Sequence, residues 1–328
     1  MAARRSAQQT LFAEPPRVAA AAPNPEHEAL AALLPGDVRL GTMSWTFPGW
    51  KGCVYSNDSD AKRLSDQGLP AYARHPLLGA VEIDRSYYEP LRAPTFSEWR
   101  AQVPDGFRFV VKAHEECTVF RFPAHARYGK KGATLNPRFL DASYATDAVV
   151  GPVCEGLGEK LGLLLFQFPP QAVGSALEFA SALRTFLLRL PRGVPYAVEI
   201  RNSELLTPAY ASALTEGGAV HCHNAWGAMP SVLQQARALP APVRRPLLVR
   251  WLLRAGDAYE EARSRYAPFA RIAEADPTTR DLIAELVVRA ISYKVPAFVL
   301  INNKAEGCAP ESAFELARSI VGRFSSSP

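Results

Sequence analysis

The sequence predicts an α/β fold of the (β/α)8 type, a TIM barrel, and three observations support this prediction. Short apolar runs of strand length alternate with amphipathic segments of helix length from residue 37 onward, as in parallel α/β folds. Eight such runs fit a closed barrel better than a doubly wound sheet, which usually has fewer strands. The Gly-rich phosphate turns GxGxxG and GxxxxGK[ST] are absent from the sequence, which argues against the common nucleotide-binding folds.

The predicted elements follow one another in a regular order. The strands are runs rich in Val, Leu, Ile and Phe, at residues 38–42, 80–84, 107–113, 162–168, 196–202, 219–224, 247–253 and 297–303. The helices have apolar residues at helical spacing, and Ser, Thr or Asp caps open several of them. They cover residues 93–102, 175–190, 207–216, 231–239, 280–293 and 310–323.

The composition is that of a folded protein, and the length fits either one large barrel or two smaller domains. Of the 328 residues, 48% are hydrophobic and 21% are charged, close to the averages for globular domains. Residues 1–36 are rich in Ala and Pro, and we expect a flexible arm with one or two helical turns near its end. The TIM-barrel domain is predicted to cover residues 37–328.

Charge and cysteine usage indicate where the protein works and what it binds. The net charge of +5 favours anionic partners, either phosphorylated ligands or nucleic acid. Five cysteines stand singly without a CxxC spacing, so a reducing cytoplasmic location is expected. No apolar run reaches the roughly 20 residues that span a bilayer, and no secretory signal is evident, so no membrane partner is expected.

Polar residues gather toward the C-terminal ends of the predicted strands. In a TIM barrel these ends form the active-site face, so the side chains should meet at one mouth. Ion pairs that only close the barrel are the alternative interpretation. The candidate positions are Glu82, Asp84, Lys112, His114, Gln167, Glu199, Arg201, His221, His223, Asn224, Arg250, Asn302 and Asn303.

The charged candidates suggest two kinds of chemistry. Lys112, Arg201 and Arg250 are suited to bind phosphate or carboxylate groups. Glu82 and Glu199 would then act as acid and base, or as metal ligands. Both interpretations use the same residues, and the sequence does not choose between them.

The histidines extend this hypothesis. His114 or His223 would supply a proton to a leaving group, while ordinary core or hydrogen-bonding roles are the alternative. Cys222, between two histidines, is expected to face the helices as a small core residue. A divalent metal would find enough donors here, although no zinc signature is present and the nearby cations oppose it. The donors are His114, His221, His223, Glu82, Asp84 and Glu199.

Two long segments follow strands and should therefore lie at the mouth. Residues 115–138 and 254–280 interleave basic and aromatic side chains. Such segments can hold phosphates and stack on bases. Solvated loops with a few buried anchors are the alternative.

Several motifs together resemble the YecE-like family, also called domain of unknown function 72. They are GTMSWTFPGWKGCVY from Gly41, AVEIDRSYYEPL from Ala80, GFRFVVKAHEECT from Gly106, LLLFQFPP from Leu163, YAVEIRN from Tyr196 and VLINNKAEGCAP from Val299. The resemblance covers about residues 37–322 and implies a TIM barrel without supplying a reaction.

Positions that match the family's motifs coincide with the strand-end candidates and add aromatic residues to them. The sequence departs from the family pattern where Val119 and Phe120 follow Thr118, because a histidine usually follows that threonine. The matched positions are Trp45, Trp50, Glu82, Tyr87, Tyr88, Lys112, Gln167, Glu199, Arg201 and Asn303.

A second resemblance lies in the arm. QQTLF, from Gln8 to Phe12, is similar to the peptides with which bacterial DNA polymerases and repair proteins bind the sliding clamp. Such peptides order on binding and bury two adjacent apolar side chains, here Leu11 and Phe12. A chance match, or docking of these residues on the barrel, is the alternative.

The sequence therefore favours a cytoplasmic TIM-barrel enzyme acting on a phosphate-containing substrate, nucleic acid included, as a hydrolase or phosphodiesterase. One alternative is a non-catalytic accessory protein that binds nucleic acid or the sliding clamp. Another is a sugar-binding or sugar-converting barrel, with paired carboxylates and with Trp45 and Trp50 for stacking.

Overall fold

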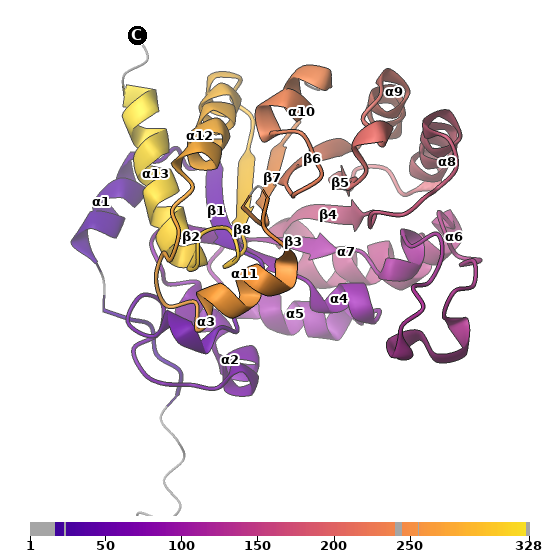
Figure 1. The fold of residues 1–328 in the computed structure, drawn as a ribbon. Coiled ribbons are helices and arrows are strands. Elements are labelled where there is room, and N and C mark those ends of the chain that lie inside the picture. The colour runs from indigo at the N-terminus through magenta and orange to yellow at the C-terminus, as the bar shows by residue number, and fades with distance from the viewer. Residues whose placement is uncertain (1–16, 23, 240–244, 255, 326–328) are drawn as a thin grey trace, which may run out of the picture.

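The fold is a closed eight-stranded barrel surrounded by helices (Figure 1). This computed structural model of the chain describes residues 17–22, 24–239, 245–254 and 256–325. The clamp-like residues Gln8, Leu11 and Phe12 lie outside the described residues, so their role stays a prediction.

All barrel strands are parallel, and β8 closes the sheet by pairing with β1. This confirms the predicted (β/α)8 fold, with strand limits within three residues of the predicted ones. The strands are β1 Val38–Thr42, β2 Leu78–Ile83, β3 Arg108–Lys112, β4 Leu161–Gln167, β5 Tyr196–Glu199, β6 Val220–Ala225, β7 Leu247–Trp251 and β8 Ala297–Ile301.

The barrel interior is filled by small and apolar side chains in its lower and middle parts. Because side chains alternate across a strand, each inward residue is followed two positions later by another. Ala80, Val110 and Leu165 belong to this interior cluster, and the next inward positions on β2 and β3 are Glu82 and Lys112. The polar residues of the mouth therefore pack directly against the apolar interior of the barrel.

The helices form the outer layer, and side-chain caps open several of them. Ser175 caps α8 with a reciprocal Glu178 contact, and Asp276 caps α12. The longer helices are α5 Ala93–Ala101, α8 Ala176–Arg189, α9 Pro208–Gly217, α12 Pro277–Ser292 and α13 Ala309–Ser325; the shorter ones are α2 Ala61–Gln67, α3 Leu69–Tyr72, α4 Arg85–Tyr88, α6 Ala142–Ala145, α7 Gly151–Leu157 and α10 Val232–Ala238.

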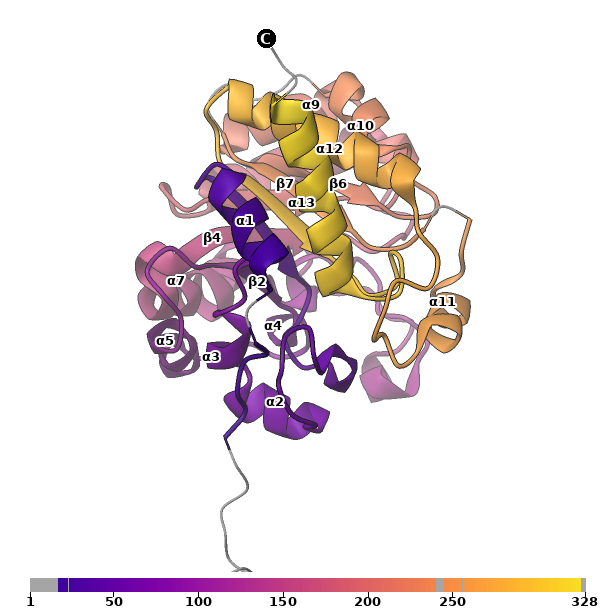
Figure 2. The ribbon, with the colours of Figure 1, turned by 90° about the vertical axis from the view of Figure 1, so that its left-hand side faces the viewer.

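The barrel-associated part of the chain begins before the predicted boundary at residue 37. Helix α1, Pro25–Leu33, lies against α13 (Figure 2). Asn24 caps this helix, and the buried His27 ring lies 4.4 Å from the ring of Phe314. An apolar stripe on α13 therefore covers part of a segment that composition alone assigned to the arm.

The two long loops at the mouth carry short helices that periodicity did not predict. The first contains the 3-10 turns Glu115–Cys117 and Ala126–Lys131, and the second contains α11, Tyr259–Tyr266. Both lie at the C-terminal ends of strands, as expected. Among the described residues, no helix has the length and apolar character needed to cross a membrane.

Candidate active site at the strand C-terminal ends

A pocket of about 580 Å³ opens at the C-terminal ends of the strands. Its position is the one at which TIM barrels carry their active sites. The predicted residues that line it are Trp45, Trp50, Glu82, Asp84, Tyr87, Tyr88, Lys112, Gln167, Arg201, Arg250, Asn302 and Asn303.

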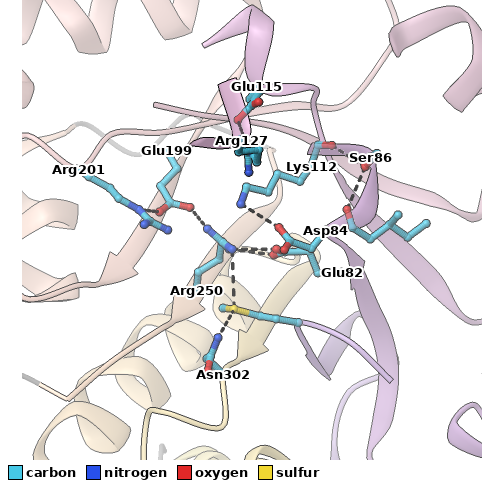
Figure 3. Close-up of polar contacts among 12 residues, drawn as sticks. Glu82, Asp84, Ser86, Lys112, Glu115, Arg127, Glu199, Arg201, Arg250 and Asn302 are labelled. Carbon is cyan, nitrogen blue, oxygen red and sulfur yellow. Dashed lines mark hydrogen bonds and ion pairs between the residues drawn. The ribbon is translucent and has the colours of Figure 1, made fainter. Parts of the chain in front are cut away.

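Arg250 from β7 lies at the centre of the pocket floor (Figure 3). Its Nε and Nη2 each donate to a different carboxylate oxygen of Glu82 at 2.8 Å. Its Nη1 donates to Oε2 of Glu199. Three strands are thereby joined by one guanidinium in a water-poor position, since all three residues are at most 2% exposed.

The second oxygen of Glu199 is also occupied. Arg201 donates from Nε to Oε1 of Glu199 at 2.8 Å and stacks 4.2 Å from the centre of the Trp226 ring. Burial alone would raise the pKa of Glu199, but Arg250 and Arg201 outweigh it and lower this pKa to about 2. Glu199 therefore stays ionised at neutral pH and is a poor proton acceptor.

Glu82 differs from Glu199 in its electrostatic surroundings. Burial raises its pKa, while Arg250 acts in the opposite direction. Both of its oxygens accept from Arg250, so its carboxylate is not free to take a proton from a ligand. The arrangement of Glu82, Arg250 and Glu199 is that of a rigid floor that positions other groups.

Asp84 is the carboxylate that reaches the pocket with a partly exposed side chain. The side chain is 38% exposed, and Oδ1 accepts from Nζ of Lys112 at 2.8 Å. The Lys112 ammonium also lies 3.9 Å from the centre of the Tyr87 ring. Ser86 donates to the Lys112 carbonyl oxygen at 2.7 Å and ties the loop after β2 to the end of β3.

Aromatic side chains form the walls of the pocket. Trp45 packs edge-on against Trp99 with their centroids 5.6 Å apart. Trp226 and Tyr259 also line the pocket, together with Lys304. Sequence reasoning missed Trp226, Lys304 and Trp99 because they lie on loops or helices beyond the strands, where no alternation marks the inward positions. Tyr259 lies in the segment 254–280, which was expected at the mouth.

His114 does not reach this pocket. It lines a neighbouring groove with Glu115, Glu116 and Arg127, and Tyr88 borders both cavities. The ring nitrogen Nδ1 lies 2.7 Å from the hydroxyl of Tyr144. The expectation that His114 donates a proton at the mouth therefore lacks geometric support.

The predicted orientation of the β6 side chains was wrong. Cys222 packs in the barrel interior, whereas His221 and His223 line a cavity on the outer, helix-facing side of the barrel. His221 bonds to the hydroxyl of Tyr210 and to Oε1 of Gln235, both at 3.0 Å. A proton-donating role for His223 at the mouth is therefore not supported by its position.

Three further predicted residues have contacts of a structural kind. Nε1 of the fully buried Trp50 donates to Oδ1 of Asn303 at 3.1 Å, and the same oxygen accepts from the backbone of Ala309 at 2.8 Å. Asn224 donates to the carbonyl oxygen of Ile200 at 3.0 Å. These bonds link neighbouring loops to the barrel.

The metal hypothesis is not supported by the arrangement of the donors. The described part of the chain contains no group of three or more His, Cys, Asp or Glu side chains that could hold a metal ion. The expected donor set is divided, because His221 and His223 face the helices and His114 lies in the neighbouring groove.

The buried His221 should make the protein sensitive to acid. Burial lowers its pKa from 6.5 to about 4, so the unfolded chain takes up a proton that the folded chain refuses between these values. The free energy of unfolding should fall as the pH is lowered through this window, by up to about 1.4 kcal/mol per pH unit from this residue. Urea titrations of the protein and of His221→Gln should show a shallower pH dependence in the variant; identical slopes would contradict the assignment.

The fold and site define a class: a TIM-barrel protein with a buried ion-pair floor and an aromatic, cation-lined pocket at its mouth. Sequence comparison assigns the chain more closely. The family described as protein of unknown function DUF72 matches residues 39–326, and the chain belongs to this family.

Individual relatives agree with this assignment. The chain is 29% identical over 149 residues to the UPF0759 protein YunF of Bacillus subtilis strain 168, a match that covers 45% of this chain and 48% of YunF. The chain thus spans about half the length of that curated relative.

Two crystal structures of DUF72 family proteins share the fold. The protein from Thermotoga maritima MSB8 has a TM-score of 0.57 at 20% identity, covering 86% of this chain and 98% of its own. The protein from Enterococcus faecalis V583 has a TM-score of 0.54 at 18% identity, covering 88% and 98%.

Proposed function

We propose that this protein is a hydrolase that cleaves a phosphoester in the pocket at the strand C-terminal ends, with nucleic acid as the substrate class. The observation that carries the proposal is the charge of the pocket lining. Cations outnumber carboxylates there, with Arg85, Lys112, Arg201, Arg250 and Lys304 against Glu82, Asp84 and, in the floor, Glu199.

The aromatic walls support a ligand that contains rings as well as phosphate. Trp226 carries the Arg201 guanidinium on its face, and Tyr87 carries the Lys112 ammonium. Bases stack on such aromatic faces while cations contact the phosphates. Tyr88, with a 54% exposed side chain, offers a further stacking surface between this pocket and the groove beside it.

Asp84 and Lys112 would carry the reaction. Asp84 takes a proton from water, the water oxygen forms a bond to phosphorus, and the ester oxygen leaves and takes a proton from solvent. Lys112 stabilises the charge that develops on the phosphoryl oxygens. Glu82, Glu199 and Arg250 form the rigid pocket floor beneath this pair.

The other two candidate functions are weighed by the same contacts. A glycosidase needs two carboxylates that act separately as acid and base or nucleophile, whereas Glu82 and Glu199 bond to the same guanidinium. A non-catalytic platform that binds nucleic acid would use the same pocket lining without turnover, whereas sliding-clamp binding is predicted for Gln8, Leu11 and Phe12 of the arm. A reaction assay separates it from an enzyme.

The proposal is tested by incubating the purified protein with a labelled single-stranded oligonucleotide and, separately, with bis(p-nitrophenyl) phosphate. We expect cleavage of the phosphodiester, seen as shortened oligonucleotide and released nitrophenol. Binding of the oligonucleotide without any cleavage would contradict the enzyme and support the platform.

A further inference from the structure

Lys304 is a buried cation whose charge has no carboxylate partner among the residues that the structure describes. It follows β8, lines the strand-end pocket and is 7% exposed. Lys112, equally buried at 7% exposure, is instead paired with Asp84. A carboxylate thus compensates the buried charge of Lys112, whereas none does so for Lys304.

The surroundings of Lys304 hold it in place without neutralising it. Its Nζ lies 4.1 Å from the centre of the Tyr259 ring and 5.9 Å from that of Phe269. Its backbone N–H donates to Oδ1 of Asn302 at 2.9 Å. Phe269 packs edge-on against Phe47 of the loop after β1, so three loops fix this position.

The energetics leave room for a ligand. Taking an ammonium out of water is unfavourable, and a cation–π contact compensates only part of this desolvation. An anionic group beside Nζ would supply the remaining compensation. Lys304 follows β8 and Tyr259 lies in the loop after β7, and these two loops frequently form the phosphate site of TIM barrels.

We propose that Lys304 forms a second anion-binding position in the pocket, separate from the one at Lys112. Strands β1 and β2 lie between the strands that precede or carry these lysines, β8 and β3. A ligand that uses both positions carries at least two anionic groups, and successive phosphates of a single-stranded nucleic acid fit this chemistry and the aromatic walls. The inference rests on the proposed function for its substrate class, but not on catalysis.

Thermal unfolding with inorganic phosphate at constant ionic strength tests the position directly. A ligand that binds the folded state raises the melting temperature. The unmodified protein should be stabilised by phosphate, Lys304→Met should lose a large part of this shift, and Lys304→Arg should keep it. Without phosphate, Lys304→Met should melt no lower than the unmodified protein, because the substitution removes an uncompensated buried charge.

Lys160 provides the matched control. Its side chain is 14% exposed, and its ammonium donates to the carbonyl oxygens of Val103 at 2.6 Å and Arg100 at 3.1 Å and lies 3.5 Å from Oδ1 of the exposed Asp105. Lys160→Met should lower the melting temperature, because it leaves these carbonyls without their donor, and should keep the phosphate shift. A full phosphate shift in Lys304→Met, or no shift in the unmodified protein, would overturn the inference.

A second measurement separates this inference from the proposed reaction. For a single-stranded oligonucleotide, the logarithm of the binding constant falls linearly with the logarithm of the salt concentration. The magnitude of this slope should be smaller by about 0.7 in Lys304→Met, which corresponds to the loss of one phosphate contact. A reduced slope in Lys304→Met, without any cleavage by the unmodified protein, would support the anion position at Lys304 and contradict the hydrolase. Cleavage by the unmodified protein, together with an unchanged slope in Lys304→Met, would contradict the anion position alone.

Discussion

Replacing Asp84 by Asn should lower phosphodiester hydrolysis by about 10²- to 10⁴-fold, the usual contribution of a general base. The substitution keeps the shape of the side chain and removes its ability to take a proton from water. Oligonucleotide affinity should be kept or increased, because Lys112 loses its carboxylate partner and is freed for phosphate. Steady-state rates and equilibrium binding, measured on the same preparation, check both parts.

The chain offers a matched control for this substitution. Lys51 and Asp58 form a Lys–Asp pair on the surface, with side chains 51% and 84% exposed. Asp58→Asn should leave hydrolysis and binding unchanged. If Asp84→Asn retained the full rate while folding normally, Asp84 would not be the base and the proposed mechanism would fail.

Replacing Arg250 by Ala should produce the largest loss of stability. The guanidinium bonds to Glu82 and Glu199, and its removal leaves the buried Glu82 carboxylate without its partner and the buried Glu199 carboxylate with Arg201 alone. Breaking a buried pair in this way costs about 3–5 kcal/mol. Urea unfolding at neutral pH should show this loss in the free energy of unfolding. The loss should shrink as the pH is lowered, because protonation neutralises both carboxylates.

Two comparison variants separate the ionic effect from a simple loss of packing. Arg184 pairs with Glu216 on the surface, where the side chains are 52% and 44% exposed, so Arg184→Ala should cost at most about 1 kcal/mol. Combining Arg250→Met with Glu82→Gln and Glu199→Gln should recover much of the lost stability, because no buried carboxylate remains without a partner and Arg201 still stacks on Trp226. Equal losses in Arg250→Ala and Arg184→Ala would show that the floor does not support the barrel.

The fold was predictable because its signals are local. Runs such as Phe109 to Val111 and Leu163 to Phe166 are apolar on both faces, as expected of a parallel strand covered by helices on one side and barrel core on the other. The capping residue Ser175 marked the start of α8, whereas α12 begins at Pro277 after its cap Asp276, three residues before the predicted start. The packing of α1 on α13 was not predicted, because Ala-rich composition does not reveal a distant partner.

The site was predictable where strand alternation fixes the side-chain direction. Glu82, Lys112, Gln167 and Arg250 each lie at an inward position next to the barrel end, and all four line the pocket. Alternation shows that neighbouring side chains of a strand face opposite ways, but it does not show which of them face the barrel interior. In β6, His221 and His223 were expected to face the mouth, yet Cys222 between them is the side chain that packs in the interior.

The sequence did not show which charged side chains would pair with one another. Arg250 lies 168 residues from Glu82 and 51 from Glu199, and only closure of the barrel brings them together. This closure turns two expected catalytic carboxylates into parts of a buried floor and leaves Asp84 facing the pocket. Lys304, a residue just past β8, carried no signal beyond its charge.

Anion binding in the strand-end pocket is tested most directly by a crystal structure of the protein with tungstate, a phosphate analogue that anomalous scattering locates unambiguously. We expect tungstate in this pocket at two positions, one beside Lys112 and one beside Lys304. A pocket without tungstate, in crystals that bind the ion only at surface lysines and arginines, would contradict anion binding at this site and with it the proposed phosphoester substrate.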